Sequence, residues 1–175
     1  MAIATKEHWF ERSFAFDTPL ARWPCILDRL RGAPARAEEK TRGVSSSRLT
    51  HRFGNTWSAQ ENIGHLADLE ALWSARLDDF LAGAPMLRPA DLDNKATWNA
   101  GHNNHPIAPV LDGFRAARAG FLSRLEGLDP AELELASLHP RLKQPMRIID
   151  HAFFVAEHDD YHLARIHELL AMKLS

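Results

Sequence analysis

Apolar residues recur at helical spacing in four long segments of this chain, and no stretch sustains the alternation of a β-strand. The clearest helix starts with a capping-box pattern, in which Ser58 is the N-cap and Glu61 lies three residues later. Its apolar face continues to a predicted end near Gly83, just before Pro85. Four amphipathic helices bury their apolar faces against one another, so the sequence predicts an all-α four-helix bundle.

The other three helices are predicted from the same spacing. The first should begin near Thr18, because threonine is a good N-cap and Pro19 suits the first helical position. Gly32 and Pro34 should interrupt it, and a short helical piece should follow from Ala35 to about Arg42. The third and fourth helices are expected at about 107–125 and 146–172.

Two connections carry further information. The longer one, from about Ala84 to Pro106, contains Trp98, His102 and His105. We expect it to be functional, because loops of this length in compact domains usually are. His102 and His105 could then line the mouth of a pocket. The stretch from Ser137 to Pro145 contains Pro140 and Pro145 and should be irregular.

Composition limits the possible functions. A length of 175 residues suits one domain, 1–175, whose core needs no disulfide or structural metal, so a bound metal would serve chemistry. The net charge of -2 argues against a nucleic-acid surface, and no apolar run is long enough to span a membrane. The single cysteine, Cys25, cannot form an internal disulfide. We predict a buried, inert thiol and a cytoplasmic chain.

Ten histidines are present, and two of them have an informative spacing. His158 and His162 lie four residues apart on the fourth predicted helix, about 40° apart in direction, so both rings can reach one point on its inner face. A buried imidazole without a partner costs roughly 1–3 kcal/mol, and a metal ion removes that cost by accepting the lone pair. Two hydrogen-bonded core histidines, or a pair on the helix surface, would have the same spacing.

His65 turns this pair into a candidate site. It lies about two turns into the capped helix, at the edge of its apolar face beside Leu69 and Leu72. Metal sites in helical bundles are built from inward-facing side chains on different helices. Three imidazoles and one open position form a reactive type of site. The sequence therefore predicts that His65, His158 and His162 bind one divalent metal ion.

The remaining histidines compete for these roles. His151 shares the stripe of His158 and is an alternative ligand or a pocket residue. His167 points away from that stripe and should be solvated. Surface or loop positions are predicted for the histidines without helical partners, His8, His51 and His139.

Charged residues near the predicted ligands have two interpretations. Asp159 could accept a hydrogen bond from a ligand imidazole of a neighbouring helix. Glu157 and Asp160 are expected on a solvated acidic face. Arg76 either faces an anionic group of a substrate or extends past Trp73 into solvent.

Two segments resemble a known family. Residues 57–70 read WSAQENIGHLADLE and resemble the second-helix motif of the DinB/YfiT-like family, and residues 156–166 read AEHDDYHLARI and resemble its last-helix motif. Between them lie a long loop, a third helix and His139-Pro140, in the order that the family shares. The resemblance covers roughly residues 20–170.

The resemblance implies a four-helix bundle with up-down-down-up topology and three histidine ligands, which correspond to His65, His158 and His162. It also implies zinc or nickel as the metal and a homodimer. Characterised members of the family include thiol-dependent S-transferases and a mycothiol-dependent isomerase.

Two functional hypotheses follow. The first is a metal-dependent enzyme that activates a low-molecular-weight thiol or water against a small-molecule substrate, as an S-transferase or a hydrolase. The second is a non-enzymatic stress-response or ligand-binding module, whose metal site the protein fills, with His151 as a possible fourth ligand. A coordination sphere with an open position beside an apolar pocket would favour the first hypothesis.

Overall fold

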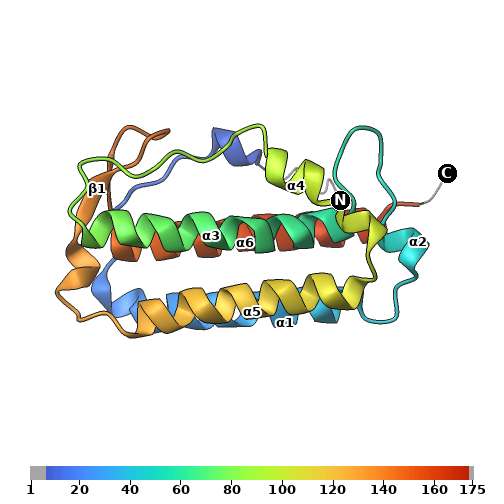
Figure 1. Ribbon diagram of the computed structural model, residues 1–175, viewed down its shortest axis with the longest axis horizontal. Helices are drawn as coiled ribbons and strands as arrows, with labels where there is room; N and C mark the ends of the chain where they lie inside the picture. Colours follow the sequence, from blue (N-terminus) through green and yellow to red (C-terminus); the bar gives the residue numbers. More distant parts are fainter. Residues whose placement is uncertain (1–6, 174–175) are drawn as a thin grey trace, which may run out of the picture.

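The computed structural model describes residues 7–173, and Figure 1 shows that long helices dominate them. The bundle consists of α1 (Trp23–Thr41), α3 (Ala59–Leu81), α5 (Ile107–Glu126) and α6 (Ile148–Ala171). Helix α1 packs against α5 and α6, and α3 packs against the same two helices. The prediction of a four-helix bundle is therefore confirmed. No helix in this part of the chain is both long and apolar enough to cross a membrane.

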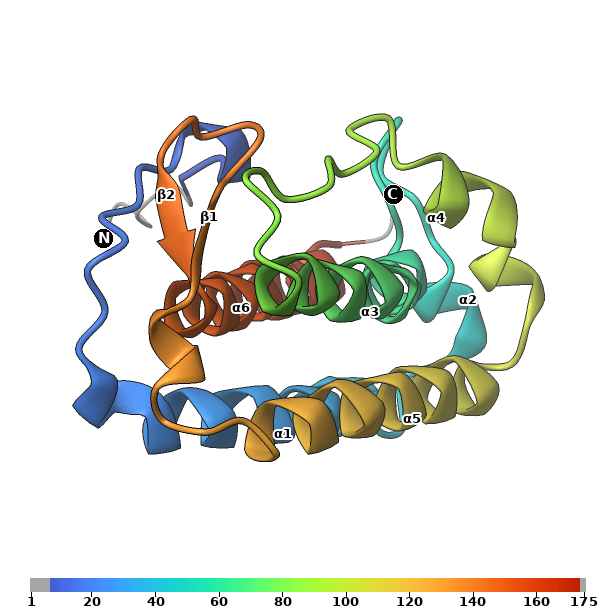
Figure 2. The same cartoon turned by 60° about the vertical axis from the view of Figure 1, so that its left-hand side comes forward.

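The four helices run up, down, down and up. Figures 1 and 2 show α1 and α6 running in one direction and α3 and α5 in the other. Because α3 and α5 are parallel, the chain must travel back along the 23-residue α3, about 35 Å, before α5 can begin. Residues 82–106 make this return, which explains the length of the predicted loop.

Short elements occupy the connections. Part of the return loop is helical, and its elements pack against α3. A β-hairpin, in which Ala136 pairs with Arg147, precedes α6, and a parallel bridge from Met86 to Leu138 extends it. The prediction of an irregular segment was therefore wrong at both ends of 137–145, because three-residue strands are too short to create a periodic pattern. The short elements are η1 (Trp9–Glu11), η2 (Leu20–Arg22), α2 (Ser46–Leu49), α4 (Lys95–Ala100), η3 (His102–Asn104), η4 (Glu132–Glu134), β1 (Ala136–Leu138) and β2 (Pro145–Arg147).

Helix α1 differs from its prediction. It begins at Trp23 rather than near Thr18, because the residues just before it form the 3-10 helix η2, whose N-cap is Pro19. It also continues through Gly32 and Pro34, so the predicted interruption was wrong. Pro34 is buried together with its helical neighbours, and this packing outweighs the hydrogen bond that a proline cannot donate.

Cys25 is exposed on α1, so the predicted burial was wrong. The next residue, Ile26, and Leu30 one turn later face the core instead. Apolar neighbours in the sequence do not fix the rotation of a helix, because the side chains that pack best decide which face is buried.

A buried ionic cluster joins three helices of the bundle. Arg118 of α5 is 1% exposed and donates to Glu70 of α3 at 2.9 Å and to Asp159 of α6 at 3.0 Å. It also donates to the Leu30 carbonyl oxygen of α1 at 3.0 Å, so one side chain touches all four long helices. Asp159 was expected beside a ligand imidazole, and that prediction was wrong because its carboxylate binds Arg118.

We expect the substitution Arg118→Met to lower the free energy of unfolding by about 3–5 kcal/mol, because Glu70 and Asp159 would keep buried carboxylates without a counter-charge. Arg115→Met on the same helix is the matched control. The Arg115 ion pair with Glu38 is solvent-exposed, and its loss should cost at most about 1 kcal/mol. Urea unfolding of both variants measures the difference. Equal losses would contradict a central role for the cluster.

Candidate metal centre

Three histidines meet where α3 packs against α6. His65 comes from α3 and His158 and His162 from α6, and all three are buried, at 3%, 4% and 7% exposure. One nitrogen from each ring lies within 4.8 Å of the other two. The ring centroids are 5.3 Å apart for His65 and His158, 4.7 Å for His65 and His162, and 4.5 Å for His158 and His162.

The capping box places His65 by fixing where α3 begins. The Ser58 side chain accepts from the Glu61 backbone N–H at 3.1 Å, and the Glu61 carboxylate accepts from the Ser58 N–H at 2.9 Å. Arg52 pairs with the same carboxylate and ties the preceding loop to the helix start. The first two turns of α3 therefore have a fixed register, and His65 faces α6 from there.

A hydrogen-bond chain fixes the tautomer of His65. Thr97 donates its hydroxyl proton to Asp68 at 2.8 Å, so its oxygen accepts from the His65 Nδ1–H at 3.0 Å. His102 contacts the same Asp68 oxygen through Nε2 at 3.0 Å. The Nδ1 proton of His65 is thus engaged, and its Nε2 lone pair is left for a metal ion.

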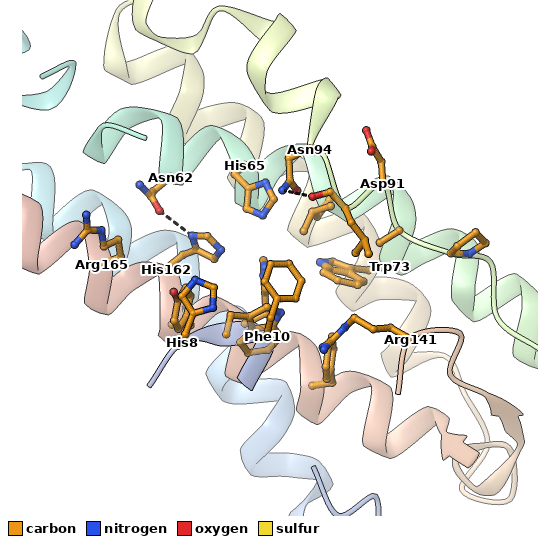
Figure 3. A pocket seen from close by; sticks show the side chains of 18 of the residues that line it. His8, Phe10, Asn62, His65, Trp73, Asp91, Asn94, Arg141, His162 and Arg165 are labelled. Carbon is orange, nitrogen blue, oxygen red and sulfur yellow. Dashed lines mark hydrogen bonds between the residues drawn. The ribbon is translucent and has the colours of Figure 1, made fainter. Parts of the chain in front are cut away.

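Asn62 fixes the tautomer of His162 in a similar way. Its amide nitrogen donates to the Ser58 carbonyl oxygen at 2.8 Å, which turns its oxygen toward His162. That oxygen lies 2.8 Å from Nδ1 of His162 and accepts its proton, as Figure 3 shows. Nδ1 of His162 therefore carries the proton, and the lone pair on Nε2 points away from Asn62, as a metal ligand requires.

The electrostatics of the cluster also fit a metal ion. Burial lowers the pKa of His65 to about 4 and holds the pKa of His158 well below its usual range, so both rings are neutral at pH 7. Neutral imidazole is the form that binds metal. His158 Nδ1 is buried and has no hydrogen-bond partner within residues 7–173. The three histidines are therefore able to hold a divalent ion.

Gly64 lets the return loop approach the centre. A Cβ atom at this position would lie 2.3 Å from the ring of His102, far closer than two atoms can approach. Without a side chain at Gly64, the His102 ring lies against α3 and reaches Asp68. The helix and the loop are thus joined next to His65.

The histidines open into a pocket of about 430 Å³. Its walls are largely aromatic, and Trp57 lies 4.5 Å from His65 while Trp9 lies 5.0 Å from His158, between ring centroids. Sequence reasoning missed both tryptophans and also Asn62, Thr97 and Asp68. Asn62 and Asp68 lie three residues before and after His65, one helical turn away, and this spacing was an available signal.

His151 lies apart from the cluster. It is fully buried among the rings of Trp73, Phe80 and Phe121, and its Nε2 lies 3.2 Å from the Trp73 carbonyl oxygen. The group of side chains that could share one ion contains His65, His158 and His162 but not His151. The alternative in which His151 is a ligand was therefore wrong, and His151 does not line the pocket of the three histidines either.

Other predicted residues have mixed outcomes. His102 and His105 line a pocket, as predicted, but it is a second pocket and not that of the three histidines. His139 was expected on the surface but is 3% exposed, and it lines the pocket together with the buried Arg76. Glu157 and Asp160 were expected to be solvated, but both pair with Arg29. The remaining predictions agree with the structure: His8 and His167 are exposed, and His51 is half-buried in a loop.

Comparisons with known proteins give one family and one similar fold. The family model described as the DinB superfamily matches residues 29–166. Among solved structures, YfiT from Bacillus subtilis is similar in fold, with a TM-score of 0.77 and 18% sequence identity over 91% of this chain and 91% of that chain. YfiT is described as a probable metal-dependent hydrolase with an unusual four-helix bundle topology. No curated protein matches this chain.

The burial of His151 generates a prediction about acid stability. Burial lowers its pKa from 6.5 to about 3 in the folded chain, so between these values only the unfolded chain binds a proton there. The free energy of unfolding must then fall as the pH falls below about 6.5. We expect His151→Leu to reduce this slope by about 1.4 kcal/mol per pH unit. Urea unfolding between about pH 5 and pH 7 tests this, with exposed His167→Leu as the control, and an unchanged slope in His151→Leu would contradict it.

Proposed function

The chain belongs to the DinB superfamily, and from this we propose that it is a metal-dependent enzyme in which His65, His158 and His162 hold one divalent ion. One observation carries the proposal: three buried histidines, two of them with rings oriented by hydrogen bonds, open into a pocket with aromatic walls. Catalytic metal sites typically have three protein ligands and one position for water or substrate, whereas structural sites are closed by four.

The bound ion would lower the pKa of a water molecule from 15.7 toward about 7, or deprotonate a thiol. The chain supplies the remaining requirements. Thr97 and Asn62 hold two of the rings in one orientation, and the indoles of Trp57 and Trp9 pack against His65 and His158 as apolar walls of the pocket. Such a site suits hydrolysis of a small molecule or transfer of a low-molecular-weight thiol to an electrophile. The description of YfiT favours hydrolysis.

Zinc or nickel is the metal that we propose. Imidazole ligands suit zinc, copper, iron and nickel, and three imidazoles without a thiolate do not select further. Elemental analysis of protein purified without a histidine tag identifies the metal. We also retain a homodimer, a cytoplasmic location and a small-molecule partner as predictions.

The non-enzymatic alternative requires a site that the protein fills. Its candidate fourth ligand was His151, which instead lies against the Trp73 carbonyl oxygen in the core. No fourth His, Cys, Asp or Glu joins the three histidines within the described residues. This arrangement favours the enzyme over a structural or sensory metal site.

We expect His162→Ala to lose the metal and the activity together. The assay compares metal-loaded variants on nitrophenyl esters for hydrolysis and on a chlorodinitrobenzene with cysteine for thiol transfer. His167→Ala, an exposed histidine on the same helix, should keep both the metal and the activity. Full activity in His162→Ala after confirmed metal loss would refute the proposal.

Thr97→Val removes the hydroxyl group that accepts from His65 while keeping its shape. Outer partners of metal ligands typically contribute 10–100-fold to affinity, so we expect metal binding to weaken by about that factor. Competition with a chelator measures the change. Thr50→Val is the control, because the Thr50 hydroxyl donates only to the Ser46 carbonyl oxygen. Equal affinities in both variants would contradict the proposed role of Thr97.

A further inference from the structure

The pocket has a second polar region, away from the histidine cluster. Arg76 of α3 and Arg141 of the β1–β2 connection line the same pocket as the three histidines. Trp73 separates the two regions, since its ring centroid lies 5.7 Å from that of His158 and 5.6 Å from the Arg76 Cζ. Figure 3 shows Trp73 and Phe10 in the space between His65 and Arg141.

Neither arginine has a carboxylate partner among residues 7–173. Arg76 is 2% exposed, and its Nε donates to the Arg88 carbonyl oxygen at 3.1 Å. Arg141 stacks against Phe10 at 5.3 Å, and its Nη2 is buried without a hydrogen-bond partner. The nearby Asp79 is paired with Arg88. Burial lowers the pKa of Arg76 to about 10, so its guanidinium group stays charged at pH 7, and burial also lowers the pKa of Arg141.

His139 adds a third donor to the two arginines. Its Nδ1 accepts the Leu142 backbone N–H at 3.1 Å, so in the neutral ring the proton must be on Nε2. That Nε2 lies 3.4 Å from Nη1 of Arg76, which is also a donor. Two donors that face each other cannot form a hydrogen bond. The arrangement lacks an acceptor, and an oxyanion between them would provide one.

Arg118, the other buried arginine, has a structural role and provides a comparison. Arg118 is 1% exposed, and two carboxylates and a carbonyl oxygen surround it. Arg76 is equally buried but has one carbonyl oxygen. The one acidic residue among the described residues that line the pocket, Asp91, already accepts the backbone N–H groups of Asp93 and Lys95. Among the described residues, Asp79 is a carboxylate whose charge reaches Arg76, and it already pairs with Arg88, so neither arginine of this region has an ion-pair partner of its own.

We propose that Arg76, Arg141 and the Nε2–H of His139 bind an oxyanion, a carboxylate or a phosphate group, on the substrate. This inference rests on the proposed function, because it takes the pocket to be the substrate site. The substrate would be a small molecule with an apolar, preferably aromatic, body. Its anionic group would lie against the arginines, and its reacting group would reach past Trp73 to the three histidines.

The test compares ligands that share an aromatic body. Binding of phenylbutyrate, phenyl phosphate and neutral phenylbutyramide is measured by calorimetry on metal-loaded and metal-free protein. We expect at least one anion to bind about 10-fold or more tightly than the amide in both forms, and the tighter anion identifies the head group. Equal binding of all three, or an anion preference that disappears with the metal, would overturn the inference.

Variants of the two arginines test whether these residues cause the preference for the anion over the amide. Arg141→Gln, on a half-buried loop position, should weaken binding of the preferred anion by about 10-fold and leave the amide unchanged. Arg76→Lys should weaken binding of the anion less than Arg76→Gln does, because lysine keeps the positive charge and loses only the planar, two-pronged donor geometry of the guanidinium group. Arg124→Gln, which removes one positive charge from α5, is the control. An anion preference that survives Arg141→Gln and Arg76→Gln would refute the site. Because no step requires catalysis, its failure is distinguishable from failure of the proposed enzyme.

Discussion

The contact between α3 and α6 holds three imidazoles together in the interior of the bundle, and much of the remaining structure serves that contact. Buried histidines are costly unless each nitrogen has a partner. Here Thr97 and Asn62 take the Nδ1 protons of His65 and His162. These bonds keep the two rings from turning toward other acceptors, and one nitrogen of each of the three rings lies within 4.8 Å of the other two. The hydrogen bonds thus stabilise the fold and define the chemistry of the site at once.

The topology explains where the other parts of the site come from. Parallel packing of α3 and α5 requires a connection that returns along the whole bundle, and residues 82–106 pass beside the histidines on the way. This segment supplies Thr97 to His65 and the His102 ring that lies over Gly64. The return loop is therefore part of the candidate metal centre as well as a connection. A bundle with alternating helix directions would have short loops at its ends and no such segment over the site.

Local signals in the sequence predicted much of this architecture. The Ser58–Glu61 box fixed the start of α3, and helical spacing identified His65, His158 and His162 as one group. Predictions failed where distant residues decide the outcome. Pro34 stays inside α1 because it packs in the core, and Asp159 binds an arginine that lies 41 residues away in the sequence. Periodicity describes one helix at a time, so it cannot reveal pairings between helices or the path of a loop.

The two buried arginines, Arg76 and Arg118, lower the pKa of histidines near them. The charge of Arg118 adds to burial in lowering the pKa of His158, and the charge of Arg76 adds to burial in lowering the pKa of His139 and His151. Positive charge in a poorly solvated interior disfavours protonated imidazole. Arg118 therefore helps to keep His158 in the neutral form that can bind metal, whereas Arg76 acts on two histidines outside the candidate metal centre. In the core that charge is balanced by Glu70 and Asp159, whereas at the pocket it is unbalanced and available to an anionic ligand.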